Sequence, residues 1–100
     1  MYDLKLMRRA ECDTGDICEW YEQQQPGLGL RFLTWLDQCY EAIRENPHRF
    51  AMVFEEFRQG LVPVSAHLVY YRIEGNEVVV YRIVHYARDQ DAILESLTEL

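Results

Sequence analysis

The segment VVVYRIVHYARD, residues 78–89, joins a strand-like apolar run to a group of ionisable side chains. Its β-branched and aromatic first half favours a β-strand. Its second half contains His85, Tyr86, Arg88 and Asp89. Histidine exchanges protons near neutral pH, and a guanidinium stabilises the charge that develops on a phosphate during cleavage. The end of this strand is therefore either the reaction centre of a metal-independent ribonuclease or the polar rim of a small sheet.

The turn that precedes this strand predicts its partner in a hairpin. The sequence EGNE at residues 74–77 is typical of a two-residue turn, because glycine and asparagine adopt positive φ at low cost. If residue 74 faces residue 77, His67 lies opposite Val84 and His85 lies opposite Ala66. The two histidines, with the tyrosine that follows the second, are then expected at the open end of one hairpin.

Two amphipathic helices precede the hairpin. In RRAECDTGDICEWYEQQQPG, Ile17, Trp20 and Tyr21 follow helical spacing before a Pro-Gly stop. A second helix is predicted over residues 28–43, and Pro47 follows its end. The short link between the helices predicts antiparallel packing. The apolar stripe of the second helix consists of Leu28, Phe32, Trp35, Leu36, Cys39, Tyr40 and Ile43.

The remaining runs predict a sheet. After about ten irregular residues, three strand-like runs follow one another, and a short alternating run opens the chain. This order predicts one α+β domain over residues 1–100, with the helical hairpin packed on one face of a three- to four-stranded antiparallel sheet. The strand-like runs are residues 2–7, 57–64, 66–74 and 76–86.

A short helix is expected at the end of the chain. Ile93, Leu97 and Leu100 recur at helical spacing. Asp89 or Asp91 is the candidate N-cap, because a carboxylate there accepts hydrogen bonds from the first free N–H groups.

The composition limits the partners of this chain. Acidic residues outnumber basic ones by 17 to 10, the formal net charge is −7, and Lys5 is the only lysine. Binding to nucleic acid through phosphates requires a basic surface, so direct DNA binding is not expected. No apolar run approaches the roughly 20 residues of a membrane span, and the N-terminal residues do not resemble a signal peptide. A cytoplasmic protein is predicted.

The cysteines and histidines predict no metal site. Cys12, Cys18 and Cys39 are odd in number and form no Cys-x-x-Cys pair, so free thiols are expected. The histidines have no recognised ligand spacing. No metal ion and no cofactor is therefore expected.

Three segments resemble the RelE/ParE superfamily of bacterial toxins. WYEQQQPGLGLRFLTWLDQCYEAIRENP, residues 20–47, is similar to the helical hairpin of that superfamily. FRQGLV, residues 57–62, resembles its arginine-bearing strand, and HLVYYRIEGNEVVVYRIVHYARD, residues 67–89, resembles its final hairpin. The likeness extends over residues 2–95. The positions that carry it are Pro26, Gly29, Arg31, Phe32, Ile43, Pro47 and Arg58.

This resemblance implies the toxin of a type II toxin–antitoxin pair, neutralised by a small cognate antitoxin. RelE-like members are ribosome-dependent mRNA endoribonucleases, whereas ParE-like members resemble them in fold and poison DNA gyrase. The resemblance leaves both mechanisms open. It also leaves open a degenerate member that only binds its antitoxin.

The nuclease mechanism requires a base, an acid and cations around the phosphate. His85 and Tyr86 occupy places similar to a His-Tyr pair in some nuclease members. However, His67 stands where nuclease members commonly carry an arginine, and Leu94 stands near the place of a tyrosine. The lysines that hold RNA in such enzymes are missing. If the protein is a ribonuclease, its candidate catalytic residues are His85, Tyr86, Arg88 and His67, with Glu55 or Glu56 as a base.

The sequence therefore favours a ParE-like toxin that acts on DNA gyrase by protein binding. The acidic stretch over residues 11–22 is either a solvated helix face or an acidic docking surface. Arg72 and Arg82 lie mid-strand, where we expect them to pair with this helix, and Arg58 could do the same. The candidate partner-binding residues are Arg58, Arg72, Arg82, Trp20 and Tyr21.

Overall fold

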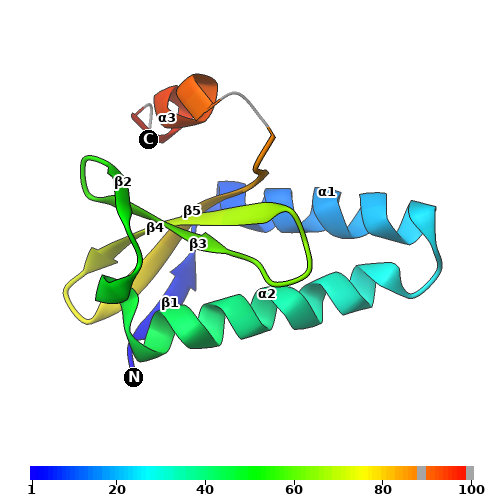
Figure 1. The fold of residues 1–100 in the computed structure, drawn as a ribbon, viewed down its shortest axis with the longest axis horizontal. Helices are drawn as coiled ribbons and strands as arrows, with labels where there is room; N and C mark the ends of the chain where they lie inside the picture. Colours follow the sequence, from blue (N-terminus) through cyan, green and yellow to red (C-terminus); the bar gives the residue numbers. More distant parts are fainter. Residues whose placement is uncertain (88–89, 99–100) are drawn as a thin grey trace.

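The described part of the chain, residues 1–87 and 90–98 of the computed structural model, forms a five-stranded sheet with three α-helices (Figure 1). The predicted α+β fold, with its helical hairpin and terminal helix, is confirmed. The strands are β1 (Asp3–Leu6), β2 (Met52–Phe54), β3 (Phe57–Leu61), β4 (His67–Glu74) and β5 (Glu77–His85). The helices are α1 (Arg8–Gln24), α2 (Leu28–Glu45) and α3 (Gln90–Thr98), with a 3-10 turn at Pro47–Arg49.

The sheet differs from the expected antiparallel one in two ways. Its strand order is β1-β5-β4-β3-β2, and β1 runs parallel to β5, with Leu6 beside Val80. A parallel neighbour is possible because a long crossover, which includes both helices of the hairpin, separates β1 from β5. The second difference is β2, which lies in the segment expected to be irregular. Met52 and Val53 of β2 are both exposed, so the sequence of this strand does not show the alternation of apolar and polar residues that would predict it.

The helical hairpin packs on one face of this sheet, as predicted. Phe32, Leu36, Cys39 and Ile43 of the α2 stripe are buried there. Burying each large apolar side chain contributes about 1.5–3 kcal/mol, so this face fixes the hairpin on the sheet. The strand residues that the helices cover are Val69, Tyr71, Val78, Val80 and Ile83.

All three cysteines are free, as predicted.

The terminal helix α3 covers the opposite face and lies across the sheet from α2 (Figure 1). Ile93 and Leu97 are buried in a second core, as their spacing predicts. Asp91 lies within α3 and so is not its N-cap, while Asp89 and Leu100 lie outside the described residues. The sheet residues buried in this second core are Phe57, Tyr70 and Val84. None of the described helices is long and apolar enough to cross a membrane.

A β-bulge changes the predicted register of the β4–β5 hairpin. Near the turn the register is as expected, with Glu74 opposite Glu77. Tyr70 then pairs with Arg82 and Tyr71 with Val80, so one extra residue lies on β5 between these pairs. The prediction that His67 faces Val84 and Ala66 faces His85 is wrong for this reason.

The bulge brings the two histidines to the same face of the sheet. His67 lies directly opposite His85. In an unbroken register their strands would place them on opposite faces, because successive side chains alternate. The extra residue restores a common face beyond Arg82, so both imidazoles lie on the side of the sheet that carries the helical hairpin.

The link between α1 and α2 depends on the Glu22 carboxylate and on the close packing of the two helices at Gly29. Glu22 accepts hydrogen bonds from the backbone N–H groups of Gly27 and Gly29, at 2.9 and 3.1 Å. It thereby satisfies free donors at the start of α2. Gly27 has a φ of 88°, a value that favours glycine. At Gly29 the two helices approach so closely that a Cβ would lie 2.9 Å from the carbonyl oxygen of Cys18.

We expect Gly29→Ala to destabilise the protein by about 1–3 kcal/mol, because the added methyl group meets backbone that cannot move independently. The measurement is the free energy of unfolding by urea. Gly15→Ala is the matched control, since a Cβ there meets nothing within 4 Å. In the interior of α1 this change should stabilise the helix by about 0.5–1 kcal/mol. Equal effects of the two substitutions would contradict the close-approach argument.

Candidate functional site

His67 and His85 form the centre of the candidate site. Their ring centroids are 5.3 Å apart and their planes meet at 84°. The side chain of His67 is 6% exposed, whereas His85 is exposed. The structure therefore confirms that two imidazoles meet at the open end of the hairpin, one in the core and one at the surface.

The surroundings of His67 keep it uncharged. The Ser65 hydroxyl lies 2.6 Å from Nδ1, and the ring edge contacts Phe32 and Tyr21 at centroid distances of 5.4 and 6.0 Å. Burial, and then the neighbouring His85, lower the pKa of His67 to about 4. At neutral pH this imidazole carries no positive charge, so it cannot act as the cation that a phosphodiester cleavage site requires.

The His85 ring contacts the two residues that follow it in the chain. Its ring stacks on Tyr86, with centroids 5.2 Å apart and planes at 20°. Its Nδ1 accepts a hydrogen bond of 3.0 Å from the backbone N–H of Ala87. The exposed nitrogen is thus Nε2, which carries the proton in the neutral ring. Tyr86 is 59% exposed, and the candidate Arg88 lies outside the described residues.

Arg82 is engaged by α1 and cannot serve as a free cation at this site. Its Nε donates to Asp13 at 2.7 Å, and the two side chains are only 8% and 15% exposed. Its Nη1 donates to the hydroxyl of Ser96 on α3 at 3.0 Å. The same Asp13 carboxylate accepts the backbone N–H of Ile83 at 3.0 Å. The predicted pairing of Arg82 with the acidic helix is confirmed.

The other two candidate arginines do not pair with the acidic helix. Arg72 binds Glu56, in the turn between β2 and β3, at 2.8 Å. Arg58 donates to the carbonyl oxygens of His48 and Phe50 at 3.0 and 2.6 Å. The expected pairing of Arg72 with the first helix, and the same possibility for Arg58, are wrong. Arg72 instead lies over the Phe57 ring beside Glu56, and Arg58 binds nearer loop carbonyl groups. Neither takes part in the histidine pair.

A hollow of about 300 Å³ opens between α1 and the histidine pair. We call it the α1 hollow; its lining residues are Asp16, Ile17, Trp20, His67 and His85. Trp20 is 55% exposed at its rim. The neighbouring Tyr21 instead packs into the core, where its ring stacks on Phe32 at 5.4 Å. Sequence reasoning missed Asp16 and Ile17 as lining residues, although their helical spacing to Trp20 signals a common face.

A family model described as "ParE toxin of type II toxin-antitoxin system, parDE" matches residues 4–90. The chain belongs to the ParE toxin family. No curated protein sequence matches this ParE-family chain.

Solved toxin structures share the fold of the ParE-family chain. It is similar to the "Chromosomal ParDE TA system from P. aeruginosa" at 19% identity and a TM-score of 0.75, covering 85% of this chain and 96% of that one. The isolated E. coli RelE toxin matches at 14% identity and a TM-score of 0.61, over 100% of both chains. A copper-bound mutant toxin from Helicobacter pylori matches at 13% identity and a TM-score of 0.58, over 87% and 97% of the chains. At identities this low, the structural similarity shows a common fold and nothing further.

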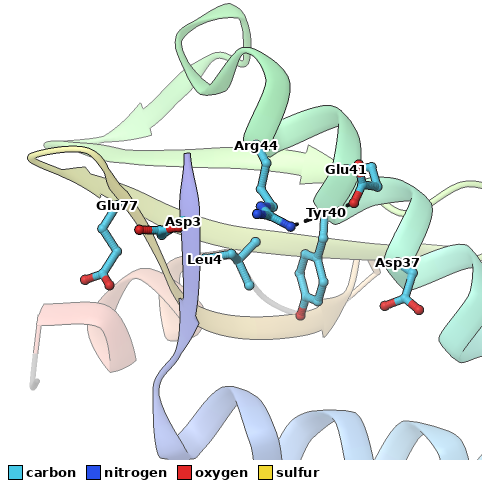
Figure 2. A pocket seen from close by; sticks show the side chains of 7 residues that line it. All are labelled: Asp3, Leu4, Asp37, Tyr40, Glu41, Arg44 and Glu77. Carbon is cyan, nitrogen blue, oxygen red and sulfur yellow. Dashed lines mark ion pairs between the residues drawn. The ribbon is translucent and has the colours of Figure 1, made fainter. Parts of the chain in front are cut away.

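The ParE-family chain has a second, wider hollow of about 600 Å³ on α2 (Figure 2). Arg44 lies in it, 3.8 Å from Glu41, and donates to the carbonyl oxygen of Tyr2 at 2.7 Å. The hydroxyl of Tyr40 is buried without a hydrogen-bond partner among the described residues, and burial raises the pKa of Tyr40. No candidate site residue lies here. The carboxylates that line it are Asp3, Asp37, Glu41 and Glu77.

The described residues of this ParE-family chain hold no group of three or more His, Cys, Asp or Glu side chains able to bind a metal ion. One imidazole of the pair, that of His85, is exposed. Of the candidate arginines that the structure describes, Arg58, Arg72 and Arg82 each bind another group. Cleavage of a phosphodiester requires charge stabilisation, and these three guanidinium groups are not free to supply it.

Removing one partner of the buried ion pair should destabilise the ParE-family fold strongly. We expect Arg82→Met to cost about 3–5 kcal/mol, because it leaves the Asp13 carboxylate mostly buried without its cation. Urea unfolding measures this change. Glu56→Gln, which breaks the exposed pair with Arg72, is the control and should cost no more than about 1 kcal/mol. A loss of similar size in both variants would refute the distinction.

The buried His67 should make stability depend on pH. Its folded pKa of about 4 lies below the ordinary 6.5, so between these values the unfolded chain binds more protons than the folded chain. The stability that the neutral His67 ring contributes is fully present above pH 6.5 and is lost as the pH falls toward 4. We expect a loss of roughly 3 kcal/mol across this window.

The measurement is the free energy of unfolding of the wild type and of His67→Gln at several pH values. The variant should lose most of the pH dependence that the wild type shows. His48→Gln, which replaces an exposed histidine, should retain it. Parallel pH curves for the wild type and His67→Gln would rule out a buried neutral imidazole.

Proposed function

We propose that this ParE-family chain acts in the cytoplasm as the toxin of a type II toxin–antitoxin pair, binds DNA gyrase, and is neutralised by a cognate antitoxin. The family match over residues 4–90 is the observation that carries this proposal. The P. aeruginosa structure with the same fold is a ParDE toxin–antitoxin system, which supports an antitoxin as partner.

The geometry supports binding as the mode of action. A phosphodiester cleavage site gains orders of magnitude in rate from a positioned cation. Here His67 replaces that cation with a neutral ring, and Arg82 is held by Asp13. The net charge of −7 also opposes approach to the anionic surface of ribosomal RNA.

The purified chain should inhibit supercoiling of relaxed plasmid by DNA gyrase, and its cognate antitoxin should restore the activity. We expect His85→Ala to inhibit within about two-fold of the wild type, because the proposed mode of action needs no proton transfer. Supercoiling that continues at saturating toxin would remove gyrase as the target.

The nuclease alternative makes the opposite prediction in a parallel assay. A ribosome-dependent ribonuclease would cut messenger RNA on translating ribosomes and would lose that activity in His85→Ala. Under the proposed function the wild type leaves the message intact. Overexpression without antitoxin separates both from a degenerate member, because only the latter would leave growth unaffected.

A further inference from the structure

The α1 hollow combines an apolar wall, an aromatic face and one carboxylate. Asp16 and Ile17 lie four and three residues before Trp20 on α1, so each neighbours its indole along one side of the helix. Trp20 is 55% exposed, so its indole is available to a partner. At about 300 Å³ the hollow is large enough for one side chain and small for most complete ligands.

The wall of the hollow is mainly apolar, and its one acidic residue favours a cation. Asp16 contributes a carboxylate, and it makes no ion pair with any described residue. His67 forms an uncharged floor, because burial keeps its pKa near 4. Arg82 lines a smaller adjoining hollow of about 170 Å³, but its charge is balanced there by Asp13.

Aromatic and acidic groups together form a characteristic receptor for guanidinium. A cation over the face of an indole gains about 0.5–1 kcal/mol at an exposed site, and arginine is the usual cation. The methylene stem of arginine also buries well against an apolar wall such as Ile17. Its planar head can stack on Trp20 while it donates hydrogen bonds to the Asp16 carboxylate.

We propose that the α1 hollow receives an arginine side chain from the toxin-binding segment of the antitoxin. This rests on the proposed function in that the antitoxin is taken as the partner. The charge of the chain supports that occupant, because its net charge is −7 and Asp16 lines the hollow. Of the other acids of α1, Asp13 is paired with Arg82 and Glu22 binds the start of α2, whereas Glu11 and Glu19 are exposed.

Two short peptides test the chemistry of the hollow on the full chain. One is acetyl-Leu-Arg-Leu-amide, and the other carries citrulline, which has nearly the shape of arginine without its charge. Both are titrated against the ¹⁵N-labelled protein, with the indole N–H of Trp20 as the reporter. We expect the arginine peptide to bind about ten-fold more tightly than the citrulline peptide.

Asp16→Asn should reduce binding of the arginine peptide to the level of the citrulline peptide. Glu19→Gln is the matched control, because Glu19 is an exposed acid on α1 that does not line the hollow. It should bind both peptides as the wild type does. The proposal is overturned if the two peptides bind alike, or if the shifted resonances lie away from the hollow.

The second measurement uses the cognate antitoxin. Asp16→Asn and Trp20→Ala should each weaken the toxin–antitoxin complex about ten-fold, and Glu19→Gln should not. Circular dichroism verifies that each variant is folded. An antitoxin that binds both variants as tightly as the wild type overturns the proposal. Failure of the antitoxin to bind the wild type at all would overturn the proposed function itself, and the antitoxin as occupant with it, even where the peptide titration succeeds.

Discussion

The ion pair between Asp13 and Arg82 joins α1 to β5 and α3, two elements that follow α1 only after a long stretch of chain. β1 ends at Leu6, so the outer edge of β5 has no strand neighbour beyond Val80. There the Asp13 carboxylate accepts hydrogen bonds from the Arg82 guanidinium and from the backbone N–H of Ile83, which a neighbouring strand would otherwise bind. Through Ser96 the same guanidinium also reaches α3. The direction of α1 along the hairpin follows from this contact, and with it the position of the α1 hollow.

The two histidines show how one local environment decides between chemistry and packing. A pair of imidazoles could exchange protons, but only if at least one is charged when the other is not. His67 is enclosed by the Ser65 hydroxyl and the rings of Phe32 and Tyr21, so its cost of protonation is high. The result is a hydrogen-bonded core residue that presents a neutral surface to the hollow. A protein-binding role fits this electrostatics better than phosphoryl chemistry.

The helical parts of the fold could be predicted because their signals are local. The spacing of Phe32, Leu36 and Cys39 gave α2, and all three are buried as expected. The turn sequence also placed both histidines at the open end of the hairpin, but their common face depends on a bulge that the turn does not predict. What could not be predicted depends on distant partners: the parallel pairing of β1 with β5 has no sequence signature, and the acceptors of Arg58 and Arg72 are carbonyl and carboxylate groups in loops.

The residues of the candidate site could be predicted only where their type is distinctive in the sequence. His67, His85 and Trp20 stand out as residue types, and the structure places all three around one hollow. Asp16 is one of several acids on a helix face, and its residue type does not distinguish it from its neighbours. Only the placement of α1 against β5 separates the acid that lines the hollow from those that face solvent. That placement is a tertiary property, fixed by a contact between residues 13 and 82.

The extra residue in β5 makes this strand behave as two joined pieces. Val78 and Val80 follow one alternation against the helices, and Ile83 restarts it after the bulge. Deleting the extra residue, Tyr81, would therefore restore one continuous alternation: Ile83 and His85 would keep their β4 partners and their side of the sheet, and the part beside β1 would stay as it is. A β5 that kept its length but lost the bulge would instead turn Ile83 out of the core beneath α2 and His85 away from His67.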